Sequence, residues 1–264
     1  LGFLASAALV VSVVLPKAKL PEKRGVYDRT TRGIRIYLAT PRLRGLLALN
    51  LAVAAASAMV IVNTVVLVQA QFGLTQHATA WALAAFGGGS MLAALTLPRL
   101  LENVSDRLAM LGGATVLAIG LFIGGFMHTY VALCLLWLIL GVGYSLAQTP
   151  SGRLLRRSAH AEDRPALFAA QFALSHACWL ITYPLAGWFG AKFGLHITFW
   201  VLGIIAMISI LLAAYVWPKR DNEEMEHSHS DLPKDHPHLV QHHVQQGKHT
   251  HAYIIDDLHQ RWPR

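Results

Sequence analysis

Long uncharged apolar runs alternate with short connections along most of the chain. The first complete run, from Gly45 to Phe72, contains no Asp, Glu, Lys or Arg and consists mainly of Leu, Ala, Val and Ile. A hydrocarbon core about 30 Å thick needs roughly 20 apolar helical residues, so this run is long enough to cross a membrane. Five similar runs follow, at 81–97, 108–127, 131–149, 165–189 and 197–217. We therefore predict an all-α integral membrane protein with six spans over residues 45–217.

Basic residues collect in every second connection between these runs. Nine Lys and Arg lie in 16–44, two in 98–107 and four in 150–164, whereas 72–80 and 128–130 contain none. Short cytoplasmic loops are enriched in Lys and Arg, so the pattern predicts that both ends of the six-span segment are cytoplasmic. The same loops account for the net charge of +8, and no nucleic-acid partner is expected.

The segments outside the six spans complete the domain organisation. Residues 1–15 form an apolar run too short to span a membrane, and we interpret it as a truncated transmembrane helix. Residues 16–44 are a basic linker, and residues 218–264 are a polar tail that we expect to be mostly disordered and cytoplasmic. Within the tail, Tyr253–Leu258 is the part expected to order as a short helix.

Two features of the linker predict structure within it. Ile34, Tyr37 and Leu38 share one helical face, which favours a short helix on the lipid surface over an irregular solvated linker. Thr40-Pro41 is typical of a helix start, since a capping residue precedes a proline at the first helical position.

Polar residues on the first, fourth and fifth spans repeat at helical spacing. In the first span they recur every seven positions and therefore stay on one face. Polar groups in hydrocarbon must face protein or water, so the stripes predict either interhelical hydrogen bonds or the wall of a solvated pathway. The candidate substrate-pathway residues are Asn50, Ser57, Thr64, Gln71, Trp137, Tyr144, Gln148, Gln171, Ser175, His176, Thr182 and Tyr183.

His176 is the one ionisable candidate well inside a span, because every Asp and Glu lies in a loop or in the tail. Its ordinary pKa of about 6.5 suits a proton switch in a proton-coupled transporter. The alternative is a neutral histidine that is hydrogen-bonded within the bundle.

The order of spans and one short motif resemble the C-terminal half of a major facilitator superfamily transporter. In that family a Gly-x-x-x-Asp-Arg-x-Gly-Arg-Arg/Lys motif lies between the second and third helices of each half. Asp106-Arg107 stands in that place here, while Glu102, Ala109 and Met110 depart from the motif. The resemblance implies helices seven to twelve of a fold in which two six-helix bundles rock about a central site. It also implies that the first, fourth and fifth spans face that site.

The resemblance further suggests a conformational latch made of Arg99, Asp106 and Arg107. Charges at helix ends can pair differently in the inward-facing and outward-facing states of a transporter. The alternative is a solvated loop ion pair that contributes under about 1 kcal/mol.

Histidine is concentrated in the tail, where nine of the chain's 14 histidines lie between residues 227 and 259. With neighbouring Asp residues they suit Zn, Ni, Co or Cu(II), although no zinc-finger spacing is present. We expect loose, exchangeable binding, and the alternative is a solvated tail with accidental affinity. The candidate metal ligands are His227, His229, His236, His238, His249 and His251.

These features predict a multi-pass transporter of a bacterial inner membrane that exports a small solute or metal ion, with protons as the expected coupling ion and no required cofactor. One alternative is efflux of drug-like or other organic molecules with no metal role. Another is a non-transporting membrane anchor for a metal-buffering tail. No HExxH, intramembrane Asp pair or Gly-x-Ser-x-Gly motif is present, so an intramembrane enzyme is not expected.

Overall fold

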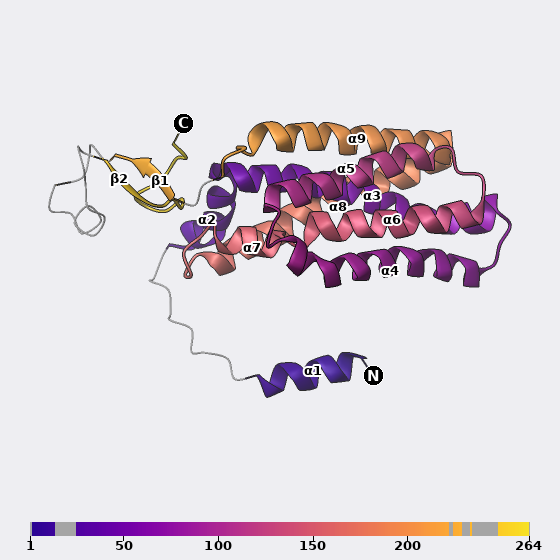
Figure 1. The fold of residues 1–264 in the computed structure, drawn as a ribbon, viewed down its shortest axis with the longest axis horizontal. Helices are drawn as coiled ribbons and strands as arrows, with labels where there is room; N and C mark the ends of the chain where they lie inside the picture. Colours follow the sequence, from indigo (N-terminus) through magenta and orange to yellow (C-terminus); the bar gives the residue numbers. More distant parts are fainter. Residues whose placement is uncertain (1, 14–24, 222–223, 229–232, 234–247, 264) are drawn as a thin grey trace.

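The computed structural model describes residues 2–13, 25–221, 224–228, 233 and 248–263. Six of its helical segments are long and apolar enough to cross a membrane, which confirms the predicted spans. The elements, labelled in Figure 1, are α1 (Gly2–Ser12), α2 (Val26–Ala39), α3 (Pro41–Val65), the π-helix η1 (Val66–Gln71), α4 (Gln76–Leu100), α5 (Asp106–Gly124), α6 (Tyr130–Gln148), α7 (Ser151–Arg156), α8 (Arg164–Phe193), α9 (Leu195–Val216), β1 (Glu224–His227) and β2 (His249–Ala252).

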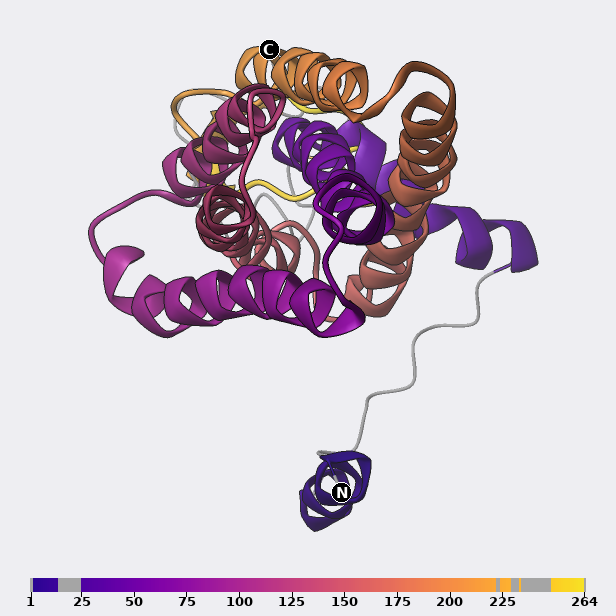
Figure 2. The ribbon, with the colours of Figure 1, turned by 90° about the vertical axis from the view of Figure 1, so that its right-hand side faces the viewer.

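The six long helices form one bundle with α3 on the inside (Figure 2). α3 contacts α4, α5, α6, α8 and α9. In the 18-residue apolar stretch of this span, 72% of the residues are buried. In the corresponding 18-residue stretches of α4 and α8, only 22% of the residues are buried, so these two helices are less covered by protein than the other four spans. Much of the polar stripe on α3 is therefore enclosed by the other helices of this bundle.

Close backbone contact between α4 and α6 depends on glycine. A Cβ at Gly89 would lie 1.9 Å from the carbonyl oxygen of Leu138, and one at Gly141 would lie 2.0 Å from that of Phe86. Small residues at such positions let helices in a membrane approach until their backbones touch. Neighbouring Gly88 meets nothing within 4 Å, so the need for glycine is specific to the contact face.

The helix boundaries follow local signals at two connections. α3 begins at Pro41 after an extended Thr40, as the Thr-Pro pair predicts, although the Thr40 hydroxyl donates to the Ile36 carbonyl oxygen (2.8 Å) rather than capping α3. The reversal between α8 and α9 turns on Gly194, whose φ of +83° lies in the left-handed region that favours glycine.

The linker contains the expected helix, α2, but this helix buries a different face. Arg32, Ile36 and Tyr37 are buried, whereas Ile34 and Leu38 are exposed. The reason is that α2 packs against α8 at the start of the fifth span, and that contact selects a face offset from the apolar one read in the sequence. Of the three residues on the predicted lipid-facing side, Tyr37 packs against protein, while contact of Ile34 and Leu38 with lipid stays a prediction.

The described part of the tail is ordered and lies beside α2 at the end of the bundle where α3 begins and α9 ends, which we call the tail end (Figure 1). β1 and β2 pair antiparallel, with Glu224 opposite Ala252 and His227 opposite His249. Residues 253–258 form bends and irregular structure rather than the predicted helix. The connection 72–80 lies at the opposite end of the bundle, as an odd number of spans between it and the tail requires.

Candidate functional site

The candidate pathway residues divide into a buried group and an exposed group. Thr64 and Trp137 belong to the buried group, where the Trp137 Nε1–H donates to the Thr64 hydroxyl at 2.8 Å and Thr64 donates to the Val60 carbonyl. Thr182 of α8 donates to the Ala54 carbonyl oxygen at 3.2 Å. These three side chains therefore join α3 to α6 and α8 by interhelical hydrogen bonds, which is one of the two alternatives that the stripes left open.

Two further members of the α3 stripe are buried without such partners. The Asn50 Nδ2 and the Ser57 hydroxyl have no hydrogen-bond partner among the described residues. Burial of an unsatisfied polar group costs about 1–3 kcal/mol, so these positions are where the stripe departs from a purely structural role. Asn63, which the seven-residue repeat misses, is buried next to the stripe and donates to the Ala186 carbonyl at 3.3 Å.

The exposed group centres on α8. Phe172, His176, Trp179 and Tyr183 stack along it, with successive ring centroids 3.8, 4.9 and 6.5 Å apart. His176 is exposed, and its Nδ1 bonds to the Phe172 carbonyl oxygen at 2.7 Å. This surface combines aromatic rings with one imidazole and suits an amphipathic organic solute better than a bare ion.

The remaining candidates are half-buried or exposed and lie on three elements. Tyr144 of α6 contacts the Phe86 ring edge-on, with the ring centroids 5.6 Å apart. Gln148 and Ser175 are half-buried, and Gln71 is exposed at the end of η1. Gln171 does not face this surface alone, because its Oε1 accepts a 2.5 Å hydrogen bond from the Tyr37 hydroxyl of α2.

The predicted latch has a different partner from the one expected. Among the described residues, Asp106 pairs with Arg153 of α7, whose Nε lies 3.1 and 3.2 Å from the two carboxylate oxygens, and not with Arg99 or Arg107. Arg107 instead donates to the carbonyl oxygens of Ala214 (2.9 Å) and Trp217 (3.1 Å) at the C-terminus of α9. A cation at that position also favours the negative end of the helix dipole.

A second charge network at the tail end centres on Asp221. This carboxylate pairs with the buried Arg42 at 3.1 Å, contacts Arg157, and accepts the Trp217 Nε1–H at 3.1 Å. Arg42 also donates to the Ser158 hydroxyl (2.9 Å). The network therefore holds together the start of α3, the end of α7 and the end of α9. Arg42 reads in the sequence as one more loop cation, and nothing local predicts that it is buried.

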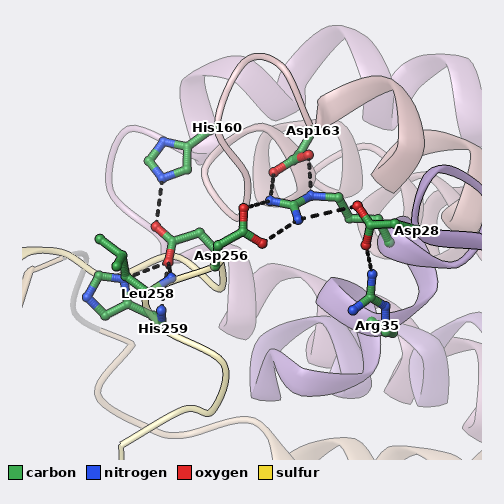
Figure 3. A network of polar contacts seen from close by, with 9 residues as sticks. Asp28, Arg35, His160, Asp163, Asp256, Leu258 and His259 are labelled. Carbon is green, nitrogen blue, oxygen red and sulfur yellow. Dashed lines mark hydrogen bonds and ion pairs between the residues drawn. The ribbon is translucent and has the colours of Figure 1, made fainter. Parts of the chain in front are cut away.

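A third network joins the linker helix to the tail (Figure 3). Arg32 of α2 donates to both carboxylate oxygens of Asp163, at 2.6 and 2.9 Å, and to Asp257 of the tail at 2.7 Å. Burial opposes the charged form of Arg32, but the hydrogen bonds to the two carboxylates outweigh it and raise the Arg32 pKa above its ordinary value. The linker, the loop before α8 and the tail are therefore linked by one guanidinium.

Asp256 provides the other link between tail and bundle. Its Oδ2 lies 3.3 Å from Nε2 of His160, and its Oδ1 lies 2.9 Å from Nδ1 of His259 (Figure 3). Burial would raise the Asp256 pKa, but the hydrogen bonds from His160 and His259 lower it well below its usual range. The same contact raises the pKa of His160, against the effect of burial.

Three of the six predicted metal ligands come together in the tail. His227, His249 and His251 each offer a ring nitrogen, and these atoms all lie within 4.8 Å of one another. His259, which was not in the predicted set because it lies outside a His-x-His pair, has its Nε2 3.0 Å from Nε2 of His227. His229, His236 and His238 lie outside the described residues.

The chain is similar to one family of known proteins. A family model described as Major Facilitator Superfamily matches residues 46–248, which include the six membrane-length segments almost entirely. A search among curated proteins finds no match.

Proposed function

Since this chain belongs to the Major Facilitator Superfamily and is part of a secondary transporter, we propose that it exports a small solute by ion-coupled alternating access, with a tail that binds or senses transition metal. Protons are the expected coupling ion. In this proposal the tail end faces the cytoplasm of a bacterial inner membrane, as the Lys and Arg in the connections at that end favour.

The histidine cluster is the single observation that carries the metal part of the proposal. Three imidazoles within 4.8 Å of one another offer nitrogen ligands that suit Zn, Ni, Co or Cu(II). They lie beside the end of the bundle that would open to the cytoplasm, so ions captured there would be close to the transport pathway. A metal ion is therefore the proposed substrate or regulator.

The ion pairs at the tail end support alternating access. Asp106 and Arg153 join the start of α5 to α7, and Asp221 with Arg42 joins the end of α9 to the start of α3. The opposite end has contacts of another kind, such as the tilted rings of His128 and His196 with centroids 6.0 Å apart. Charge pairs at one end can form and break as a bundle rocks, which is how helix-end charges control such transitions.

Efflux of organic molecules is the second candidate, and the row of rings on α8 favours it. Phe172 is exposed, Trp179 and Tyr183 are half-buried, and the three rings lie along α8 with His176 between them. Aromatic side chains with a few polar groups are typical of sites for small organic ligands.

Transport by everted membrane vesicles that carry the full-length protein tests the proposal. We expect uptake of Zn²⁺ or Ni²⁺ that depends on an imposed proton gradient and falls when the tail is removed after Asp221. The truncation keeps Asp221 because this residue holds Arg42 and Arg157, so this part of the charge network at the tail end is retained. His77→Ala, an exposed histidine at the opposite end, is the control.

Two other outcomes would replace the proposal. Pumping of a fluorescent organic cation without any metal flux would establish the second candidate. No flux of either kind, together with metal binding by the tail, would indicate a membrane anchor for a metal buffer.

A further inference from the structure

The pairing of β1 with β2 explains why the three histidine rings meet. Successive side chains of a strand point to opposite faces, so His249 and His251, two residues apart on β2, share one face. His227 lies directly opposite His249 in the antiparallel register and adds its ring to that face. The ring centroid of His227 lies 4.3 Å from that of His249 and 4.6 Å from that of His251. The sheet is thus a scaffold that brings together histidines 22 and 24 positions apart in the sequence.

The turn after β2 brings in a fourth ring. The Asp256 carboxylate accepts the backbone N–H groups of Leu258 (2.9 Å) and His259 (2.7 Å), and this turn directs the chain back towards the sheet. The His259 side chain is buried, with its ring centroid 4.9 Å from that of His227 and 5.1 Å from that of His251.

The hydrogen bonds of the rings show which nitrogen faces the cluster. The Nδ1 atoms of His227, His251 and His259 lie 2.9–3.1 Å from oxygens of Met225, Ala252 and Asp256 respectively. Carbonyl and carboxylate oxygens only accept, so these Nδ1 atoms carry the proton and the lone pair is on Nε2.

The contact between His227 and His259 therefore brings two Nε2 atoms with lone pairs together. Their Nε2 atoms lie 3.0 Å apart, and two lone pairs at that distance repel unless a proton or a metal ion lies between them. A tetrahedral site with metal–nitrogen bonds of 2.0–2.1 Å places ligand nitrogens about 3.3 Å apart. The nitrogens of His227, His249 and His251 lie within 4.8 Å of one another, and those of His227 and His259 lie 3.0 Å apart, so these distances differ from that spacing by about 1.5 Å at most.

We propose that His227, His249, His251 and His259 form a four-imidazole site for one divalent transition-metal ion, and that occupancy of this site stabilises the docked position of the tail on the bundle. The proposal rests on the metal role proposed above and names its location. Asp256 is a positioning residue: it holds His259 through one oxygen and His160, in the loop between α7 and α8, through the other. A carboxylate that orients a metal-binding imidazole is a common second partner in such sites.

Docking would restrain the moving parts of the transporter. Asp257, adjacent to Asp256, pairs with Arg32 of the linker helix, and Arg32 also holds Asp163 before α8. An occupied site therefore fixes the turn that ties the linker helix to the loop preceding the fifth span. Metal bound in the tail would resist rearrangement at the tail end, so that the ion regulates the transporter as well as binding to it.

Metal binding to the purified full chain in detergent tests the site. After chelator treatment, Zn²⁺ titrated by calorimetry is expected to show one tight site per chain. His249→Ala with His251→Ala should abolish that site, whereas His236→Ala with His238→Ala, a matched His-x-His pair elsewhere in the tail, should leave it intact. Equal losses for the two pairs would show distributed binding by the tail and overturn the site while leaving the proposed function in place.

Asp256→Asn keeps all four histidines and tests the positioning role. It is expected to weaken Zn²⁺ binding by about 10–100-fold, as loss of such a carboxylate does in other sites. Co²⁺ gives a second readout, because a tetrahedral nitrogen site produces a stronger visible absorption than an octahedral one. A wild-type Co²⁺ spectrum typical of octahedral coordination would overturn the four-imidazole arrangement.

Hydrogen–deuterium exchange tests docking separately from binding. Zn²⁺ is expected to slow exchange both in 249–259 and in the 157–163 loop. In a variant that combines His160→Ala with Asp257→Asn, and so loses the contacts of the turn with both the loop and Arg32, Zn²⁺ should still slow exchange in 249–259 and should no longer do so in 157–163. Binding without protection of 157–163 in the wild type would refute docking. Metal flux that fails while all these results hold would refute the proposed export of metal and leave the site and its docking standing.

Discussion

Replacing Gly141 by Ala would place a methyl group against the backbone of α4 where it crosses α6. The new Cβ would lie 2.0 Å from the Phe86 carbonyl oxygen and 2.8 Å from the backbone nitrogen of Ser90. Real Cβ contacts are not shorter than 3.0 Å, so the helices would have to separate by about 1 Å. Because the obstacle is backbone, no rotamer change relieves it.

The size of the effect follows from the cost of overpacking. Extra methyl groups in a packed core typically cost about 1–3 kcal/mol, and an immovable backbone places this substitution near the upper end. For a chain of this size each kcal/mol lowers the unfolding midpoint by about 2–4 °C, so we expect a fall of roughly 6–12 °C. Thermal unfolding of the purified protein in detergent, followed by intrinsic tryptophan fluorescence, measures it.

Gly88→Ala is the matched control, because Gly88 lies on α4 next to Gly89 but faces away from α6. Its Cβ meets nothing within 4 Å, so it should leave the midpoint unchanged or raise it slightly, since Ala favours a helix over Gly by up to about 1 kcal/mol. If the Gly141→Ala and Gly88→Ala variants unfold at the same temperature, the close approach of α4 and α6 at Gly89 and Gly141 is wrong.

The charged and titratable residues make three further predictions. Asp221→Asn should destabilise the fold by about 3–5 kcal/mol, measured by the same thermal assay, because it removes the carboxylate that the buried Arg42 contacts. Asp106→Asn should cost only about 1 kcal/mol of stability, since the Arg153 side chain is 48% exposed, but should increase cysteine-labelling access at the tail end; unchanged access would refute a latch. His176→Gln should leave the pH profile of transport unchanged, because the His176 Nδ1 bonds to a backbone carbonyl oxygen of its own helix; a shifted profile would instead support proton coupling by His176.

The sequence predicts the spans and their order because those features are local. An uncharged run has to be long enough to cross a hydrocarbon core, and its length can be counted without knowing its neighbours. The start of α3 after Thr40 follows for the same reason, since proline at the first helical position constrains only its own turn. The sequence also shows that Ala85, Gly89 and Ala93 of α4 form one face of small residues, because a spacing of four residues places side chains on the same side of a helix.

The site residues depend on contacts that periodicity cannot show. Repeats identify the face that Thr64 occupies, but not that Trp137 donates to it from α6. Arg32 and Asp163 are 131 residues apart, and Arg32 and Asp257 are 225 residues apart, so nothing in either local sequence pairs them. For Asp106, proximity in sequence favours Arg107, whereas the fold brings Arg153 to it from α7.

The tail shows how composition can indicate chemistry and still misjudge structure. Its His-rich, charged sequence suggests a segment with too few apolar residues to fold, yet Tyr253 and Ile255 are buried there against the bundle. Those two residues do not need a core of their own because the bundle end supplies one, while acids of the tail meet buried or half-buried cations of the linker and loops. Asp256 contacts His259 of the histidine cluster, whereas the neighbouring Asp257 accepts a hydrogen bond from Arg32. A metal ion that orders the histidine cluster would fix Asp256, which is adjacent to Asp257, the residue that contacts Arg32 of the linker helix. This adjacency is the physical reason to expect metal binding and transporter movement to be linked.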